Sequence, residues 1–212
     1  MFDSLPHANT FADATLSEIA TGLVAGTKVA TKMGWRVVEA IAPGDLVLTF
    51  DGGMQEVKNV TRQVVWAGGD LRDPDSWPLF VPAGALGNQA DMSLMPGQAV
   101  LVESDTAEAV FGDPFAMIPA KALDGFRGIT PTAPSPRIEV VTLEFAQDEV
   151  VFANIGALFF CPAAVDIFSD RAEATYACLT LEQADLLVSF LEEEDMGRAS
   201  PQRAVAAFRV AA

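Results

Sequence analysis

The chain has 212 residues, of which 50% are hydrophobic, and its 13 Lys and Arg against 29 Asp and Glu give a formal net charge of −16. The length fits one domain with short appendages, and the composition excludes a disordered chain. The acidity argues against a nucleic-acid groove, because binding phosphates requires clustered Lys and Arg. His7 is the only histidine, which leaves little imidazole for a metal site or a general base.

Targeting signals are missing from the sequence. No Lys or Arg precedes Lys28, and the longest uncharged stretches, 76–90 and 150–165, are interrupted by Pro and Gly. We therefore expect a cytoplasmic protein without a membrane span. Cys161 and Cys178 form no C-x-x-C motif and cannot complete a four-ligand metal site alone. Reduced thiols are expected in that compartment, and a disulfide between the two is the alternative.

The elements predicted in chain order are mostly short strands. A weak helical pattern over 13–23 comes first, and alternating apolar residues and turn signals then predict the strands. These strands are 27–31, 35–41, 46–50, 55–66, 78–82, 99–103, 114–119, 138–145 and 149–153. Trp35 and Trp66 are expected in the core, and Trp77 is the candidate for an exposed aromatic contact. Asp45 follows Pro-Gly and is predicted to bond to backbone amides of a turn.

The last predicted element is an amphipathic helix. It begins after Thr180, with Gln183 placed for a capping box, and its apolar residues recur at helical spacing. We expect this stripe to pack on its own domain, and a homodimer through 180–194 is the alternative. The acidic run Glu192–Asp195 is interpreted as a solvated helix end that pairs with Arg198 or Arg203.

Two stretches near the start resemble the opening of Hint domains, the self-processing modules of hedgehog C-terminal regions and inteins. They are Gly22–Thr31 (GLVAGTKVAT) and Met33–Thr49 (MGWRVVEAIAPGDLVLT). Weaker matches follow in order at 81–88, 94–101, 119–123 and 140–152, and the likeness is nearest to the bacterial branch of the family. The resemblance implies a twisted all-β horseshoe, so the expected fold is mostly β with a C-terminal amphipathic helix.

The resemblance also divides the chain. It implies an N-terminal extension (1–21) that carries the weak helical pattern, a Hint-like β domain (22–160) and a C-terminal helical extension (161–212).

The chemistry of the family depends on three positions. A Cys or Ser that begins the module attacks the preceding carbonyl, and the His of a Ser-Pro-x-His element protonates the departing nitrogen. A polar group near the second long hairpin, often His, assists. The resemblance places Gly22, Gln98 of the segment Met95–Gln98 (MPGQ) and Thr142 at these positions. Glycine has no side chain, and glutamine is no proton donor at a useful pKa. An intein would also end in His-Asn. The sequence contains no such pair, since Asn154 follows Ala153.

Three functional hypotheses remain open. The first is a Hint-like domain that has lost autoprocessing, holds no cofactor or metal, and binds an unidentified protein partner. The second is residual self-cleavage by the Thr21 hydroxyl, although a shift of one residue moves the attacking atom by about 3.8 Å. The third is a carboxylate-dependent small-molecule enzyme that uses Asp45 and Glu103. We expect the first, and therefore expect no enzymatic activity.

Overall fold

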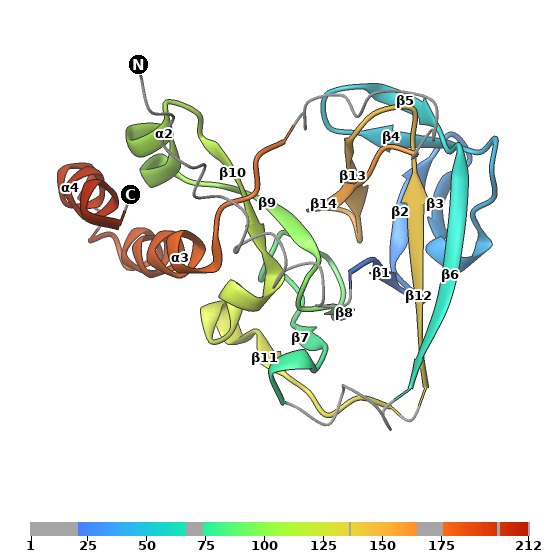
Figure 1. The fold of residues 1–212 in the computed structure, drawn as a ribbon, viewed down its shortest axis with the longest axis horizontal. Coiled ribbons are helices and arrows are strands. Elements are labelled where there is room, and N and C mark those ends of the chain that lie inside the picture. Colours follow the sequence, from blue (N-terminus) through green and yellow to red (C-terminus); the bar gives the residue numbers. More distant parts are fainter. Residues whose placement is uncertain (1–20, 67–73, 136, 165–175, 199, 212) are drawn as a thin grey trace, which may run out of the picture.

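The computed structural model describes residues 21–66, 74–135, 137–164, 176–198 and 200–211 (Figure 1). Its strands are β1 (Leu23–Val24), β2 (Lys28–Thr31), β3 (Gly34–Val37), β4 (Leu46–Thr49), β5 (Gly53–Glu56), β6 (Asn59–Trp66), β7 (Leu79–Val81), β8 (Met92–Leu94), β9 (Ala99–Glu103), β10 (Phe115–Pro119), β11 (Thr130–Pro131), β12 (Arg137–Glu144), β13 (Glu149–Ala153) and β14 (Ala157–Cys161). Its α-helices are α2 (Asp105–Phe111), α3 (Leu181–Asp195) and α4 (Pro201–Ala211), and its 3₁₀ turns are η1 (Val38–Ala40), η3 (Pro74–Ser76), η4 (Ala120–Leu123) and η5 (Phe126–Gly128). His7 and most of the predicted N-terminal helix lie outside the described residues.

Within the described residues the strands form two antiparallel sheets. One has six strands in the order β11-β7-β8-β1-β12-β6, and the other has eight, running β10-β9-β14-β13-β2-β4-β5 with β3 added on β2. Figure 1 shows β6 and β12 as a long ribbon at one end of the body and the three helices at the other. The prediction of a mostly β fold with a C-terminal helix is confirmed.

Side-chain alternation explains the strands that carry the core. In β14 the residues Ala157, Phe159 and Cys161 are buried while the two between them are only partly covered, which is the period of a strand with one face on the core. In β12, Val140 and Val141 are both buried, because this strand pairs with β1 and β6 and is covered on both faces. Strand β12 thus lies between β6 and β1, and this pairing positions β1.

Several local predictions need correction or addition. The long strand predicted for 55–66 is divided into β5 and β6, because the Val57 N–H bonds to Asp45 O at 2.9 Å and turns the chain there. The strand predicted for 35–41 ends at Val37, after which η1 begins, and the structure adds α2 and the strands β1, β8, β11 and β14. Trp35 is 40% exposed, so its expected place in the core was wrong; among the described strands β3 pairs only with β2, and none of its residues is fully buried. The side chain of Trp66 lies outside the described residues.

The capping prediction for α3 is confirmed. The Gln183 N–H bonds to Thr180 Oγ1, and the Thr180 N–H bonds to Gln183 Oε1. The apolar stripe of α3 then joins the same core as the strands, with Leu187 fully buried and Leu191 only 4% exposed. The stripe therefore packs on its own domain, and a homodimer through 180–194 stays a prediction that a light-scattering mass would test. The domain boundaries also stay a prediction.

Acidic side chains at the end of α3 attach the helix to the β body. Glu194 Oε1 accepts from the Ser104 hydroxyl at 2.9 Å and from the Thr106 N–H at 2.8 Å. The Asp195 carboxylate accepts two hydrogen bonds from the Arg127 guanidinium, one from Nε and one from Nη2. Arg203 forms an ion pair with Glu193, as expected. The acidic run is thus an attachment as well as a helix end.

None of the described helices is both long and apolar enough to cross a bilayer.

Candidate functional site

Strand β1 brings the candidate positions together. Leu23 pairs with Val141 of β12 on one side and with Leu94 of β8 on the other. Continued by one residue, these registers place Gly22 between Thr142 and Met95. Residues that adjoin β1 and β8 and a residue within β12 thus meet at one point.

Gln98 is held by three hydrogen bonds to backbone groups. Its Oε1 accepts from the Gly22 N–H at 3.1 Å, and its Nε2 donates to Ala99 O at 3.0 Å and to Phe160 O at 2.9 Å. The side chain is only 3% exposed. The oxygen and the nitrogen of the amide therefore both bond to backbone groups, and these bonds link β1, β9 and β14. None of the three hydrogen bonds requires a proton transfer.

Gly22 occupies a position where a side chain does not fit. Its φ is +114°, a region that residues with a Cβ rarely adopt. A Cβ built there would lie 2.6 Å from Val140 Cγ1 and 3.0 Å from Thr142 Oγ1. The first contact is closer than real Cβ atoms come and the second is tight, so a side chain at position 22 requires the side chains of Val140 and Thr142 to move.

A mostly apolar cavity of about 370 Å³ opens beside Gly22. Its lining includes three of the predicted positions, together with strand-end residues from β9, β10, β12 and β14: Thr21, Gly22, Leu23, Gly97, Gln98, Ala99, Pro119, Val141, Thr142, Leu143, Phe160, Cys161, Pro162 and Cys178. Met95 is not among them, because it is fully buried in a separate cluster with Ile138 and Val140.

Both cysteines line this cavity, which the sequence analysis did not anticipate. They are free thiols, so the alternative of a disulfide is not realised. Cys161 reaches the cavity because β14 pairs with β9, and only that pairing could have revealed it. Burial, with a smaller contribution from Glu149, raises the pKa of the Cys161 thiol strongly, and desolvation raises that of Cys178 to about 11. Both thiols are therefore protonated near neutral pH and poorly nucleophilic.

The other predicted groups lie elsewhere. The Asp45 carboxylate accepts from the Ala42 N–H and from Arg36, both at 3.0 Å, so its predicted turn role is confirmed. Glu103 lines a different cavity, at the end of β9, which Asp45 does not line. The part of the chain that the structure describes holds no group of three or more His, Cys, Asp or Glu suited to a metal ion.

Fold and site together define a β-rich domain built like the self-processing modules. Residues 21–158 match the family model described as Hint domain, which is more than half of the chain, and the protein therefore belongs to the Hint domain family.

Several solved structures are similar to the chain at low identity. A splice-inactive variant of the AceL NrdHF class 3 split intein is 18% identical, with 69% of this chain and 100% of that chain covered and a TM-score of 0.46. The bacterial intein-like domain from Clostridium thermocellum is 14% identical, with coverages of 66% and 98% and a TM-score of 0.47. The gp41-1 intein is 15% identical, with 66% and 98% covered and a TM-score of 0.40. No curated protein matches the chain.

Proposed function

We propose that this Hint domain has lost autoprocessing and serves as a binding or assembly module for a protein partner. The observation that carries the proposal is the state of position 22. A glycine stands where the family has its nucleophile, and the space for a Cβ is occupied by Val140 and Thr142. A side chain that restored the attacking group would therefore have to displace the side chains of Val140 and Thr142.

The remaining polar groups support the same conclusion. Gln98 lies at the Gly22 nitrogen that would depart, but it accepts a hydrogen bond there through its Oε1, and an amide has no proton to donate at a useful pKa. Cys161 and Cys178 carry raised pKa values, which keeps the thiolate population low at neutral pH. Nucleophile and general acid act as a unit in such reactions, and the absence of both removes nearly all of the rate enhancement.

A reporter fusion tests the loss of cleavage. A small reporter domain is joined upstream of Thr21, incubated with a thiol or with hydroxylamine, and followed by intact mass. We expect the mass to stay unchanged over days, because no acyl shift forms a bond that these nucleophiles open. A splicing-competent intein in the same fusion is the positive control.

Matched variants assign any cleavage that does occur. Thr21→Val keeps the shape of the side chain and removes the hydroxyl, and Cys161→Ala removes the buried thiol beside Gly22. Cleavage that disappears in Thr21→Val would establish self-cleavage by that hydroxyl. Cleavage that disappears in Cys161→Ala would establish a displaced thiol. Either outcome contradicts the proposal.

A further inference from the structure

Another cavity, which shares no lining residue with the one beside Gly22, lies on the outer face of the eight-stranded sheet. Its volume is about 480 Å³, within the range of small-ligand sites. It is lined by aromatic, aliphatic and acidic side chains from the ends of β4, β9 and β10 and from the segment before α3: Phe50, Asp51, Leu101, Asp113, Phe115, Met117, Tyr176 and Ala177. None of these lining residues is a Lys or Arg.

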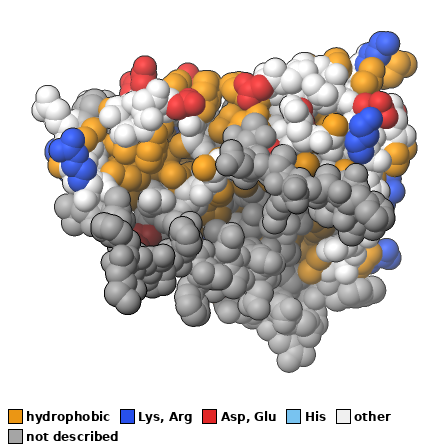
Figure 2. Space-filling model, turned by 45° about the horizontal axis from the view of Figure 1, so that its top comes forward, with side chains coloured by type: hydrophobic (Ala, Val, Ile, Leu, Met, Phe, Trp, Pro, Cys, Tyr) orange, Lys and Arg blue, Asp and Glu red, His pale blue; other side chains and the backbone are white. Residues whose placement is uncertain are grey.

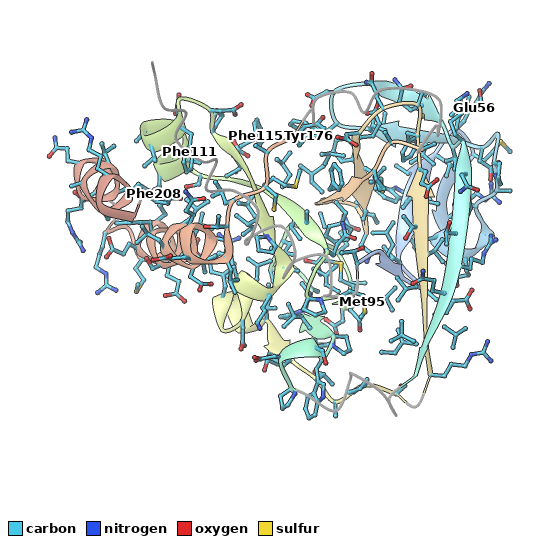
Figure 3. All side chains as sticks on the ribbon, viewed as in Figure 1. Glu56, Met95, Phe111, Phe115, Tyr176 and Phe208 are labelled. Atoms are coloured by element: carbon cyan, nitrogen blue, oxygen red, sulfur yellow. The ribbon has the colours of Figure 1, made fainter. Side chains whose placement is uncertain are left out.

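Three aromatic rings form the walls. Phe50 and Phe115 meet edge to face with their centroids 4.9 Å apart. Tyr176 lines the same cavity, and Figure 3 shows Phe115 and Tyr176 next to each other between the helices and the β4–β5 hairpin. Such rings present a negative π face to a bound group, and that face attracts a cation.

Two carboxylates stand among the rings. Asp51 Oδ2 accepts from the Tyr176 hydroxyl at 2.5 Å, and Asp113 Oδ1 accepts from the Phe115 N–H at 2.9 Å. Each carboxylate is thus held beside one ring by one hydrogen bond, and its second oxygen can accept a hydrogen bond from a ligand. Asp113 is exposed, so the rim of the cavity opens to solvent.

The electrostatic environment of the cavity is negative. The pKa of Tyr176 is raised, first by burial and then by its hydrogen bond to Asp51, with Glu149 and Asp148 adding to the effect. Figure 2 shows Asp and Glu side chains among hydrophobic ones on the upper face of the molecule, with Lys and Arg toward the two ends of the view. The net charge of −16 adds a long-range attraction for basic surfaces.

We propose that this cavity, bounded by Phe50, Phe115 and Tyr176 with Asp51 and Asp113 at its rim, binds an arginine side chain presented by a protein partner. A guanidinium plane stacks on aromatic rings and donates to carboxylates in a fork, so it uses both kinds of wall at once. An anion would meet like charges, and an apolar group would leave the carboxylates unused. The inference goes beyond the proposed function, because a cleaving Hint domain could carry the same cavity.

Tyr176 is the only tyrosine of the chain and therefore reports on the cavity directly. The full chain is labelled with carbon-13 tyrosine and titrated with a short Gly/Ser peptide that carries one central arginine. We expect a saturable shift of the single tyrosine resonance. The same peptide with citrulline, a neutral isostere of arginine, should bind at least tenfold more weakly.

Two pairs of variants distinguish binding in the cavity from non-specific attraction of the peptide to an acidic protein. Phe115→Leu and Asp113→Asn should each weaken the peptide at least fivefold. Phe111→Leu is the aromatic control, because Phe111 forms a similar edge-to-face pair with Phe208 at 5.3 Å elsewhere on the surface. Asp91→Asn is the acidic control, because Asp91 is exposed and also accepts one backbone N–H, that of Ala83. Neither control should change the binding.

Several outcomes would overturn the proposal. They are the absence of a shift, equal binding of the citrulline peptide, or equal losses in the control variants. Guanidinium chloride that binds as tightly as the peptide would show a site for a free small cation instead. Asp113 is exposed, so Asp113→Asn remains informative even where Phe115→Leu fails to fold. None of these outcomes changes the intact mass in the fusion assay, so failure here is distinct from failure of the proposed loss of cleavage.

Discussion

Two regions of this molecule hold polar side chains against the β body by opposite means. Around Gly22 the contacts are buried and neutral: Gln98 is 3% exposed and bonds only to backbone groups. At the end of α3 the contacts are charged and partly solvated: the side chains of Arg127 and Asp195 are 43% and 38% exposed. The first region joins three strands from within, whereas the second attaches a helix from outside.

The difference indicates what each region can tolerate. A buried amide that loses its partners leaves unpaired backbone groups, a loss that neither salt nor pH relieves. An exposed ion pair is screened by salt and titrates with its carboxylate. The region around Gly22 should therefore behave as a rigid structural joint, and the helix attachment should respond to solution conditions.

The largest effect is expected from a side chain at position 22. Gly22→Ala introduces a Cβ 2.6 Å from Val140 Cγ1 at a φ of +114°. Strain and overpacking together should lower the free energy of unfolding by about 3 kcal/mol. The matched control is Gly26→Ala, where φ is +92° and nothing lies within 4 Å, so only the strain of about 1 kcal/mol remains. Urea denaturation measures both. Equal losses would mean that β12 yields readily and that position 22 is open to a side chain.

A smaller loss is expected from Gln98→Ala. The change removes three hydrogen bonds, and the buried Gly22 N–H loses the acceptor that Gln98 supplies. We expect a loss of about 2–3 kcal/mol in the free energy of unfolding, unaltered by 1 M salt. Gln55→Ala, which removes one bond to Gly52 O at a half-buried position, should cost about 1 kcal/mol. A Gln98 variant as stable as the Gln55 variant would contradict the idea of a structural joint.

The smallest effect is expected at the helix attachment. The hydrogen bond from Arg127 holds the pKa of Asp195 below its ordinary value. A lowered folded-state pKa means that the stabilisation is complete above the ordinary Asp pKa and is lost as pH falls through the folded value. Asp195→Asn should therefore lower stability by less than about 1 kcal/mol at pH 7 and by less still at pH 2.

Thermal unfolding at the two pH values, with and without 1 M salt, measures the contribution of Asp195. Salt should reduce the difference between Asp195→Asn and the parent chain at pH 7, because the pair is partly solvated. If the stability difference between Asp195→Asn and the parent chain at pH 7 is the same with and without salt, this ion pair behaves like the buried contacts. The contrast between the two regions would then be wrong.

Much of the fold was predictable because its signals are local. The capping box of Thr180 and Gln183 spans four positions, and the alternation of 138–145 predicts a strand that nearly coincides with β12. Trp35 escaped prediction because its hydrophobicity says nothing about where β3 lies in the sheet, and the edge position leaves it exposed. Strand β14 was missed because residues that pair at its start, Ala153 and Ala157, have no strong strand preference.

By itself, the sequence determined the family. It also gave the residue types, glycine and glutamine, at the positions that the resemblance assigns to the nucleophile and the histidine, because residue types need no coordinates. Only the tertiary structure decided how these two residues contact each other. Gly22 and Gln98 are 76 positions apart, and their hydrogen bond depends on the pairing of β1 with β8 and β12. Likewise, Phe50, Phe115 and Tyr176 enclose one cavity because nonlocal strand pairing brings together residues that no sequence pattern relates.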